Sequence, residues 1–175
     1  MSRVLGVMTL GILVVASSLG CSGTRTPSPS AARAPGVQVP IDNGASPASV
    51  PVSVTAEQLS PERRAAFDKL DGPARLAAAV REEMVRQHRV PASPVQLALT
   101  VTSFRIRSTA TSVWFGAMAG ADVLDVETTA TKDDQVLARW KTGSGSVVGG
   151  LIRPGVDGRF DRLVTTTAER IVAGL

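Results

Sequence analysis

Side chains that commonly carry enzyme chemistry are scarce in this sequence. Its 175 residues include one cysteine, one histidine and no tyrosine, and only 3% are aromatic. With so few histidine and cysteine side chains, the chain has no ligand set for a zinc site. A serine nucleophile needs a histidine base, and the G-x-S-x-G turn that presents such a serine is missing. The sequence therefore predicts a protein that is not an enzyme and uses no cofactor or metal.

Phosphate-binding loops are missing as well. The stretch GSGSVVGG has Gly143 and Gly145 in the positions of a dinucleotide-binding loop, but Val148 stands where the third glycine is needed. Charge gives no sign of nucleic-acid binding, because the chain from Ala56 onward carries 16 Lys and Arg against 14 Asp and Glu. Such a mixed surface is unlike the basic face of a nucleic-acid-binding domain.

The N-terminus has the pattern of an export signal. Arg3 supplies a positive charge, and Val4–Ala16 follows as an apolar run of 13 residues. A membrane-spanning helix needs about 20 apolar residues, so this run is too short to remain as one. We expect residues 1–20 to be a signal peptide.

The only cysteine, Cys21, ends the segment SSLGC. This segment resembles the lipobox of bacterial lipoproteins, although Ser18 stands where leucine is commonest and Leu19 comes one residue later. The resemblance implies cleavage before Cys21, a diacylglycerol on its sulfur and an acylated amine, which would anchor the protein stably in a membrane. Ser22, which is not aspartate, implies the outer membrane, with the protein facing the periplasm. The alternative is a free thiol beside an ordinary signal-peptidase site.

The segment after the cysteine is too rich in proline and small residues to form a core. Residues 22–51 hold six of the eleven prolines, with abundant Ser, Ala and Gly. Such a composition is typical of a linker, and thirty residues of it have an r.m.s. reach of roughly 30 Å. We therefore expect a tether over 21–55 and a folded domain over 56–175, with 50–55 as a candidate first strand.

Two helices are expected at the start of this domain. Ser60 and Pro61 fit the N-cap and the first helical position. The tripeptide DGP then interrupts the helix, and a second one is expected over Pro73–Gln87. Its apolar residues recur at helical spacing: Leu76, Ala77, Val80, Met84 and Val85.

An alternating strand follows the second helix. Its inward residues are Val95, Leu97, Leu99 and Val101. Phe104 and Ile106 are apolar but have the opposite phase, so a regular strand would point them away from the core. A β-bulge near Thr102–Ser103 would restore their direction, and we predict one there.

Two more strands are expected before the C-terminus. Residues 121–131 place Leu124, Val126, Thr128 and Ala130 on the inward face. Lys132–Gln135 reads as a turn. Val136–Thr142 returns with Val136, Ala138 and Trp140 on one face.

The C-terminal segment has the clearest helical pattern. After a glycine-rich loop over 143–158, one face carries Phe160, Leu163, Val164, Thr167, Ile171 and Leu175. The opposite face is expected to carry Arg159, Arg162, Thr166 and Arg170. The predicted fold is α+β, an antiparallel three- to four-stranded meander packed against an N-terminal helical segment and a C-terminal amphipathic helix.

Few polar residues are candidates for a site. His88 lies at a predicted helix end, where a cationic side chain is favoured, so a structural role is preferred over catalysis. Asp133 and Asp134 fit a turn better than a cation site. Five arginines could form a basic patch for anionic lipid headgroups or glycan, but a solvated face is the preferred interpretation. They are Arg81, Arg86, Arg89, Arg105 and Arg107.

The segment VWFGAMAGADVL, residues 113–124, has two interpretations. Strand-like sequence flanks it and its glycines permit a positive φ, so it fits a hairpin connection or a strand entry. Alternatively Trp114, Phe115 and Met118 contact a partner protein or the membrane interface.

The order of the elements and three short motifs resemble a known family. The motifs are LxLxVxxF (97–104), FGAMAGAD (115–122) and VLARW (136–140). They resemble those of uncharacterised bacterial lipoproteins called domain of unknown function 4410, in which a Phe-Gly-x-Gly-like segment lies between two strands. The second glycine of that segment comes late here, as Gly120. The resemblance covers about residues 75–175 and implies an α+β envelope domain without assigned catalytic residues.

Two roles are therefore expected. One is a lipid-anchored, non-catalytic interaction or assembly module of the cell envelope, with an envelope protein as its partner. The other is an accessory lipoprotein of an envelope transport system that binds a lipid or a small apolar ligand. Neither role involves nucleic acid.

Overall fold

The computed structural model describes residues 39–42, 44–92, 94–107, 121–146 and 155–175. Its helices are a 3₁₀ helix at Pro47–Ser49, α1 (Pro61–Lys69), α2 (Gly72–Arg86) and α4 (Val156–Ala173). Its strands are β1 (Val52–Thr55), β2 (Gln96–Arg105), β3 (Asp122–Lys132) and β4 (Gln135–Ser146). The predicted α+β class is confirmed.

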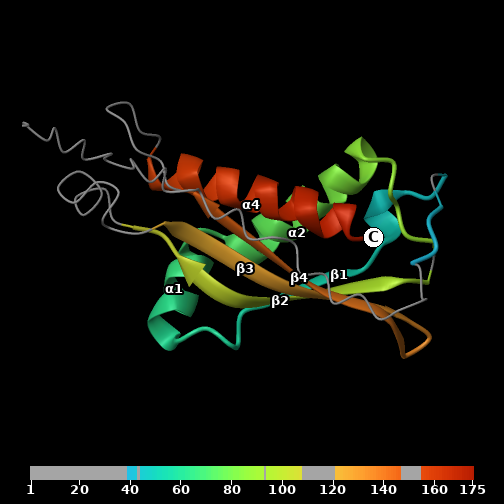
Figure 1. The fold of residues 1–175 in the computed structure, drawn as a ribbon, viewed down its shortest axis with the longest axis horizontal. Helices are drawn as coiled ribbons and strands as arrows, with labels where there is room; N and C mark the ends of the chain where they lie inside the picture. The colour runs from blue at the N-terminus through green and yellow to red at the C-terminus, as the bar shows by residue number, and fades with distance from the viewer. Residues whose placement is uncertain (1–38, 43, 93, 108–120, 147–154) are drawn as a thin grey trace, which may run out of the picture.

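The four strands form one sheet in chain order, and helices cover one of its faces. β1 pairs with β2 in parallel, while β2–β3 and β3–β4 are antiparallel. A parallel pair needs a long crossover, which α1 and α2 supply. In Figure 1, α4 runs along the sheet with α2 beside it, and α4 contacts β3 and β4 while α2 contacts β1. The core lies between these helices and the inward side chains of the strands.

The predicted bulge in β2 is confirmed. The register with β3 shifts between Val101 and Ser103, so Thr102 is the extra residue. Before the shift Leu97 and Leu99 are buried, and after it Phe104 is also buried. One added residue therefore keeps both halves of the strand facing the same core.

Three phenylalanines join α1, β2 and α4. Phe67, Phe104 and Phe160 meet edge to face, with ring centroids 5.1 to 5.9 Å apart. This is the geometry that the charge distribution of aromatic rings favours. The start of α2 packs tightly against the same cluster, because a Cβ on Gly72 would lie 2.5 Å from the Phe67 ring.

Several details differ from the sequence-based expectations. The packed region begins before Ala56, since Val39 and Val50 are buried and Ile41 bridges to Pro91. Residues 39–42 and 44–55, assigned to the tether by composition, thus belong to the fold.

The other differences lie further along the chain. β4 continues to Ser146, and α4 begins at Val156, inside the stretch expected to be a loop. Val136 is 55% exposed because the register shifts again between Ala130 and Thr131, beside the turn. Arg159, expected on the outer face of its helix, is only 4% exposed.

Helix α2 ends at a residue in the left-handed backbone conformation. His88 has a φ of 51°. The Arg89 amide donates to the Met84 carbonyl at 2.9 Å, and the His88 amide donates to Val85 at 3.1 Å. These two bonds define a Schellman motif, in which glycine normally occupies the position of His88.

Polar contacts join this end of α2 to α4. The Arg89 guanidinium donates to the carbonyls of Val172 and Ala173 at the end of α4, at 3.3 and 2.7 Å. One turn earlier, hydrogen bonds from Arg86 lower the pKa of the buried Glu83. The backbone of His88 thus closes α2, and the Arg89 side chain caps the C-terminus of α4.

Replacing His88 with glycine is expected to stabilise the fold. A left-handed conformation costs a residue with a side chain roughly 1–2 kcal/mol, so His88→Gly should raise the free energy of unfolding by about 1 kcal/mol in urea denaturation. His88→Ala is the control, since it removes the imidazole but keeps the strained backbone. Equal gains from both variants would contradict the backbone explanation.

Candidate functional site

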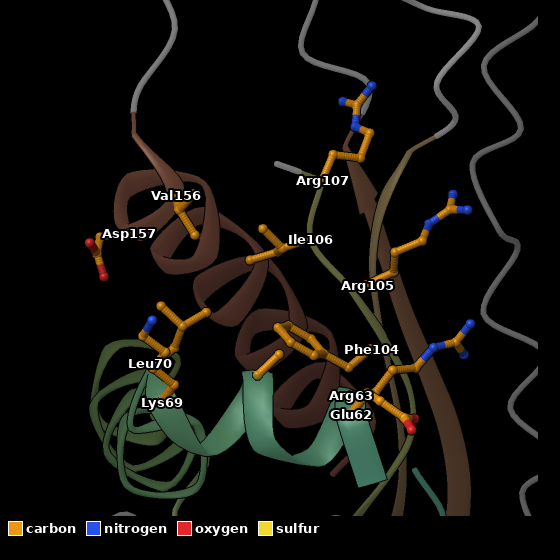
Figure 2. A pocket seen from close by; sticks show the side chains of 11 residues that line it. Glu62, Arg63, Lys69, Leu70, Phe104, Arg105, Ile106, Arg107, Val156 and Asp157 are labelled. Carbon is orange, nitrogen blue, oxygen red and sulfur yellow. The ribbon is translucent and has the colours of Figure 1, made fainter. Parts of the chain in front are cut away.

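A pocket of about 540 Å³ opens where α1, the end of β2 and the start of α4 meet. Its lining residues are Glu62, Arg63, Ala66, Lys69, Leu70, Phe104, Arg105, Ile106, Arg107, Val156 and Asp157. Figure 2 shows these side chains around the space between the three elements. The volume falls in the range of small-molecule sites, which is roughly 300–1,000 Å³.

The interior of the pocket is apolar. Phe104 comes from β2, Ile106 follows directly after that strand, Leu70 comes from the end of α1 and Val156 from the first turn of α4. The bulge at Thr102 turns Phe104 and Ile106 toward this side of the sheet, so the irregularity in β2 is what builds one wall. Ala66, on the exposed face of α1, adds a small side chain at the opening.

The rim of the pocket carries more free positive than free negative charge. In the described part of the chain, no ion pair is formed by Arg63, Lys69 or Arg105. The rim has two carboxylates, fewer than its unpaired cations. Hydrogen bonds from its own backbone and from the Ser60 side chain lower the pKa of Glu62, as does the nearby charge of Arg63, and Asp157 lies 3.6 Å from Arg75. The opening therefore favours an anion.

A buried ion cluster supports the wall behind the pocket. Asp122, which is fully buried, accepts hydrogen bonds from the Arg159 Nη1 at 2.9 Å and from the Arg107 Nε at 3.2 Å. The Arg107 amide also donates to Asp122, at 2.9 Å. Arg159 donates in addition to the Arg107 carbonyl at 2.6 Å. These contacts fix the ends of β2 and β3 to the first turn of α4.

This cluster was missed at the level of sequence, although a signal was present. Asp122 shares the inward phase of Leu124 and Val126, and a carboxylate that points into a core needs a cationic partner. Arg159 lies four residues before Leu163 and so continues the buried stripe of α4. Arginine at that position was assigned to solvent because charge was given more weight than helical phase.

The other two acidic residues of β3, Asp125 and Glu127, lie on the opposite face of the sheet from Asp122. Glu127 pairs with Arg139 at 3.5 Å and with Lys141 at 3.4 Å. Asp125 lies against Gly143, where burial raises the pKa of its carboxyl. No group of three or more potential metal ligands occurs among the described residues.

The five arginines considered as a basic patch do not form one. Arg86 and Arg89 contact α4, and Arg81 lines a smaller cavity of about 260 Å³ beside β1. Only Arg105 and Arg107 line the pocket. Asp133 and Asp134 form the predicted turn, both with positive φ. The described residues contain no helix long and apolar enough to cross a membrane.

Four predicted site residues lie outside the described residues: Cys21, Trp114, Phe115 and Met118. Trp114, Phe115 and Met118 fall in the sequence between β2 and β3, which are adjacent and antiparallel. The topology therefore fits a connection between neighbouring strands, and contact with a partner stays a prediction.

Comparison with known proteins gives only a distant structural likeness. No family model and no curated protein sequence matches the chain. A single-residue variant of PelC, a dodecamer from Paraburkholderia phytofirmans, is similar over 77% of this chain and 91% of its own, at 13% identity and a TM-score of 0.43. The PelC dodecamer from the same organism in another crystal form covers 69% of this chain and 83% of its own, at 12% identity and a TM-score of 0.39. At these scores the likeness carries no conclusion about function.

Replacing Asp122 with asparagine is expected to destabilise the fold strongly. The change keeps the shape but leaves two buried guanidinium groups without their shared carboxylate, which typically costs about 3–5 kcal/mol. Urea denaturation of Asp122→Asn measures this loss. The control is Asp68→Asn on the exposed side of α1, for which no more than about 0.5 kcal/mol is expected. A small loss for Asp122→Asn would mean that the cluster does not hold the pocket wall.

Proposed function

We propose that the protein is a lipid-anchored lipoprotein of the cell envelope whose folded domain binds a small ligand with an apolar part. The pocket between α1, β2 and α4 carries this proposal. Its volume and its apolar interior are features of small-molecule sites, and charged side chains stand around its opening. Of the two expected roles, ligand binding is the one that the described residues support.

The anchor rests on the sequence. Residues 1–20 have the order of charge, apolar run and small residues that an export signal needs, and Cys21 follows directly. We place the acyl chains on Cys21 and the protein on the periplasmic side of the outer membrane. Membership of the domain of unknown function 4410 lipoproteins is part of the same proposal, as is a partner contact through Trp114, Phe115 and Met118.

Filling the pocket from its rim is expected to abolish ligand binding. Ala66 is exposed on α1, so Ala66→Trp can place an indole in the opening without disturbing the core. We would reconstitute the full chain in phosphatidylcholine nanodiscs and add an alkyl probe with a photoreactive diazirine. In the original protein, the adducts mapped by mass spectrometry should lie on α1 and the end of β2. In the variant, the yield of these adducts should be at least about tenfold lower.

Ala65→Trp is the matched control. Ala65 is the neighbouring exposed residue of the same helix, and it does not line the pocket. The control should keep the adducts and the same melting temperature. Equal labelling of both variants, or adducts spread over the whole surface, would contradict a ligand site here.

The anchor is tested by changing its cysteine. Cys21→Ser should abolish labelling of the protein by radioactive palmitate and leave an uncut precursor of higher mass. Ser22→Asp should keep the palmitate label and shift the protein from outer-membrane to inner-membrane fractions. Undiminished acyl labelling of Cys21→Ser would show that the lipobox assignment is wrong.

A further inference from the structure

We propose that the ligand of this pocket is a single-chain anionic amphiphile. Its head would bind Arg63 and Arg105, and its alkyl chain would lie against Leu70, Ile106 and Val156. This inference rests on the proposed function, because it assigns the chemistry of the ligand that the same pocket would hold.

The first support is the charge at the opening. Three cations of the lining form no ion pair within the described residues: Arg63, Lys69 and Arg105. Of the two carboxylates, Asp157 lies near Arg75, while Glu62 keeps its charge and lies near Arg63. The opening therefore has a net positive charge. An unpaired cation loses hydration when a ligand covers it, and this cost is recovered only if the ligand brings an anion. A neutral ligand would leave that cost uncompensated.

The second support is the way Arg105 is held. Its Nε and Nη2 donate to the Ala121 carbonyl at 3.1 and 2.8 Å, which fixes the plane of the guanidinium. A guanidinium has five N–H donors in a rigid fork, so the remaining ones stay available for a carboxylate or phosphate. A side chain fixed before binding loses less conformational entropy when the ligand arrives.

The third support is that two guanidinium groups lie apart from the apolar side chains. In Figure 2 the guanidinium groups of Arg63 and Arg105 extend to the same side, and Leu70, Ile106 and Val156 lie on the other, where Lys69 and Asp157 are also drawn. A ligand that satisfies both sides must carry its charge at one end and hydrocarbon at the other. Fatty acids and lysophosphatidates share this chemistry.

The experiment compares three diazirine probes with the same twelve-carbon chain: laurate, lauroyl lysophosphatidate and the neutral monolaurin. The full chain in phosphatidylcholine nanodiscs is compared with Arg63→Gln/Arg105→Gln, each probe being scored as the ratio of pocket adducts in the two proteins. Partitioning of a probe into the lipid cancels in this ratio. At least one anionic probe should lose about tenfold in the variant, since hydrogen bonds between charged groups are strong, while monolaurin should change less than twofold.

The matched control is Arg139→Gln/Lys141→Gln, which removes the same charge from two residues of β4 that do not line the pocket and should leave every ratio near one. Greater loss for laurate would identify a carboxylate head, and greater loss for lysophosphatidate a phosphate head. Inorganic phosphate alone should not compete with the anionic probe, and equal competition would overturn the need for a chain.

Two failures are distinguishable. Equal labelling by neutral and anionic probes, unchanged in Arg63→Gln/Arg105→Gln but lost in Ala66→Trp, would overturn the anionic head and leave the proposed ligand site in place. Absence of pocket adducts with every probe would overturn both.

Discussion

One buried carboxylate joins the parts of the molecule that surround the pocket. Asp122 begins β3, yet it binds Arg107, two residues after the end of β2, and Arg159 in the first turn of α4. Burying these charges is favourable only when each has its partner. The cluster therefore holds three segments together: the chain just after β2, the start of β3 and the start of α4. The pocket wall is thus fixed by an ionic cluster, whereas most of the domain is held by aliphatic packing and the three phenylalanines.

The bulge at Thr102 is the second condition for the pocket. Without the extra residue, Phe104 and Ile106 would face away from the helices, and Arg105 would point into the core. With it, the same three residues supply apolar lining and a cation at one opening. A backbone irregularity therefore converts an ordinary strand end into an amphipathic site.

Sequence patterns predicted most of the elements but not the site. Alternation in 95–106 gave β2 and its bulge, and helical spacing gave the buried faces of α2 and α4, because both signals are local. The pocket joins residues 62–70, 104–107 and 156–157, and their proximity depends on tertiary packing that no local pattern contains. The role of Arg159 was misjudged for a related reason, since its partner lies 37 residues away in the chain.

The early start of the fold determines how tension along the chain would reach the domain. A force applied through the N-terminal segment would act first on residues 39–42. There the Asp42 amide donates to the Val90 carbonyl and the Ala92 amide donates to the Pro40 carbonyl, each at 2.8 Å. These two hydrogen bonds attach residues 40–42 to the connection between α2 and β2. Mechanical load would therefore pass into the body of the domain before it arrives at β1, and the short edge strand would be spared from peeling off the sheet.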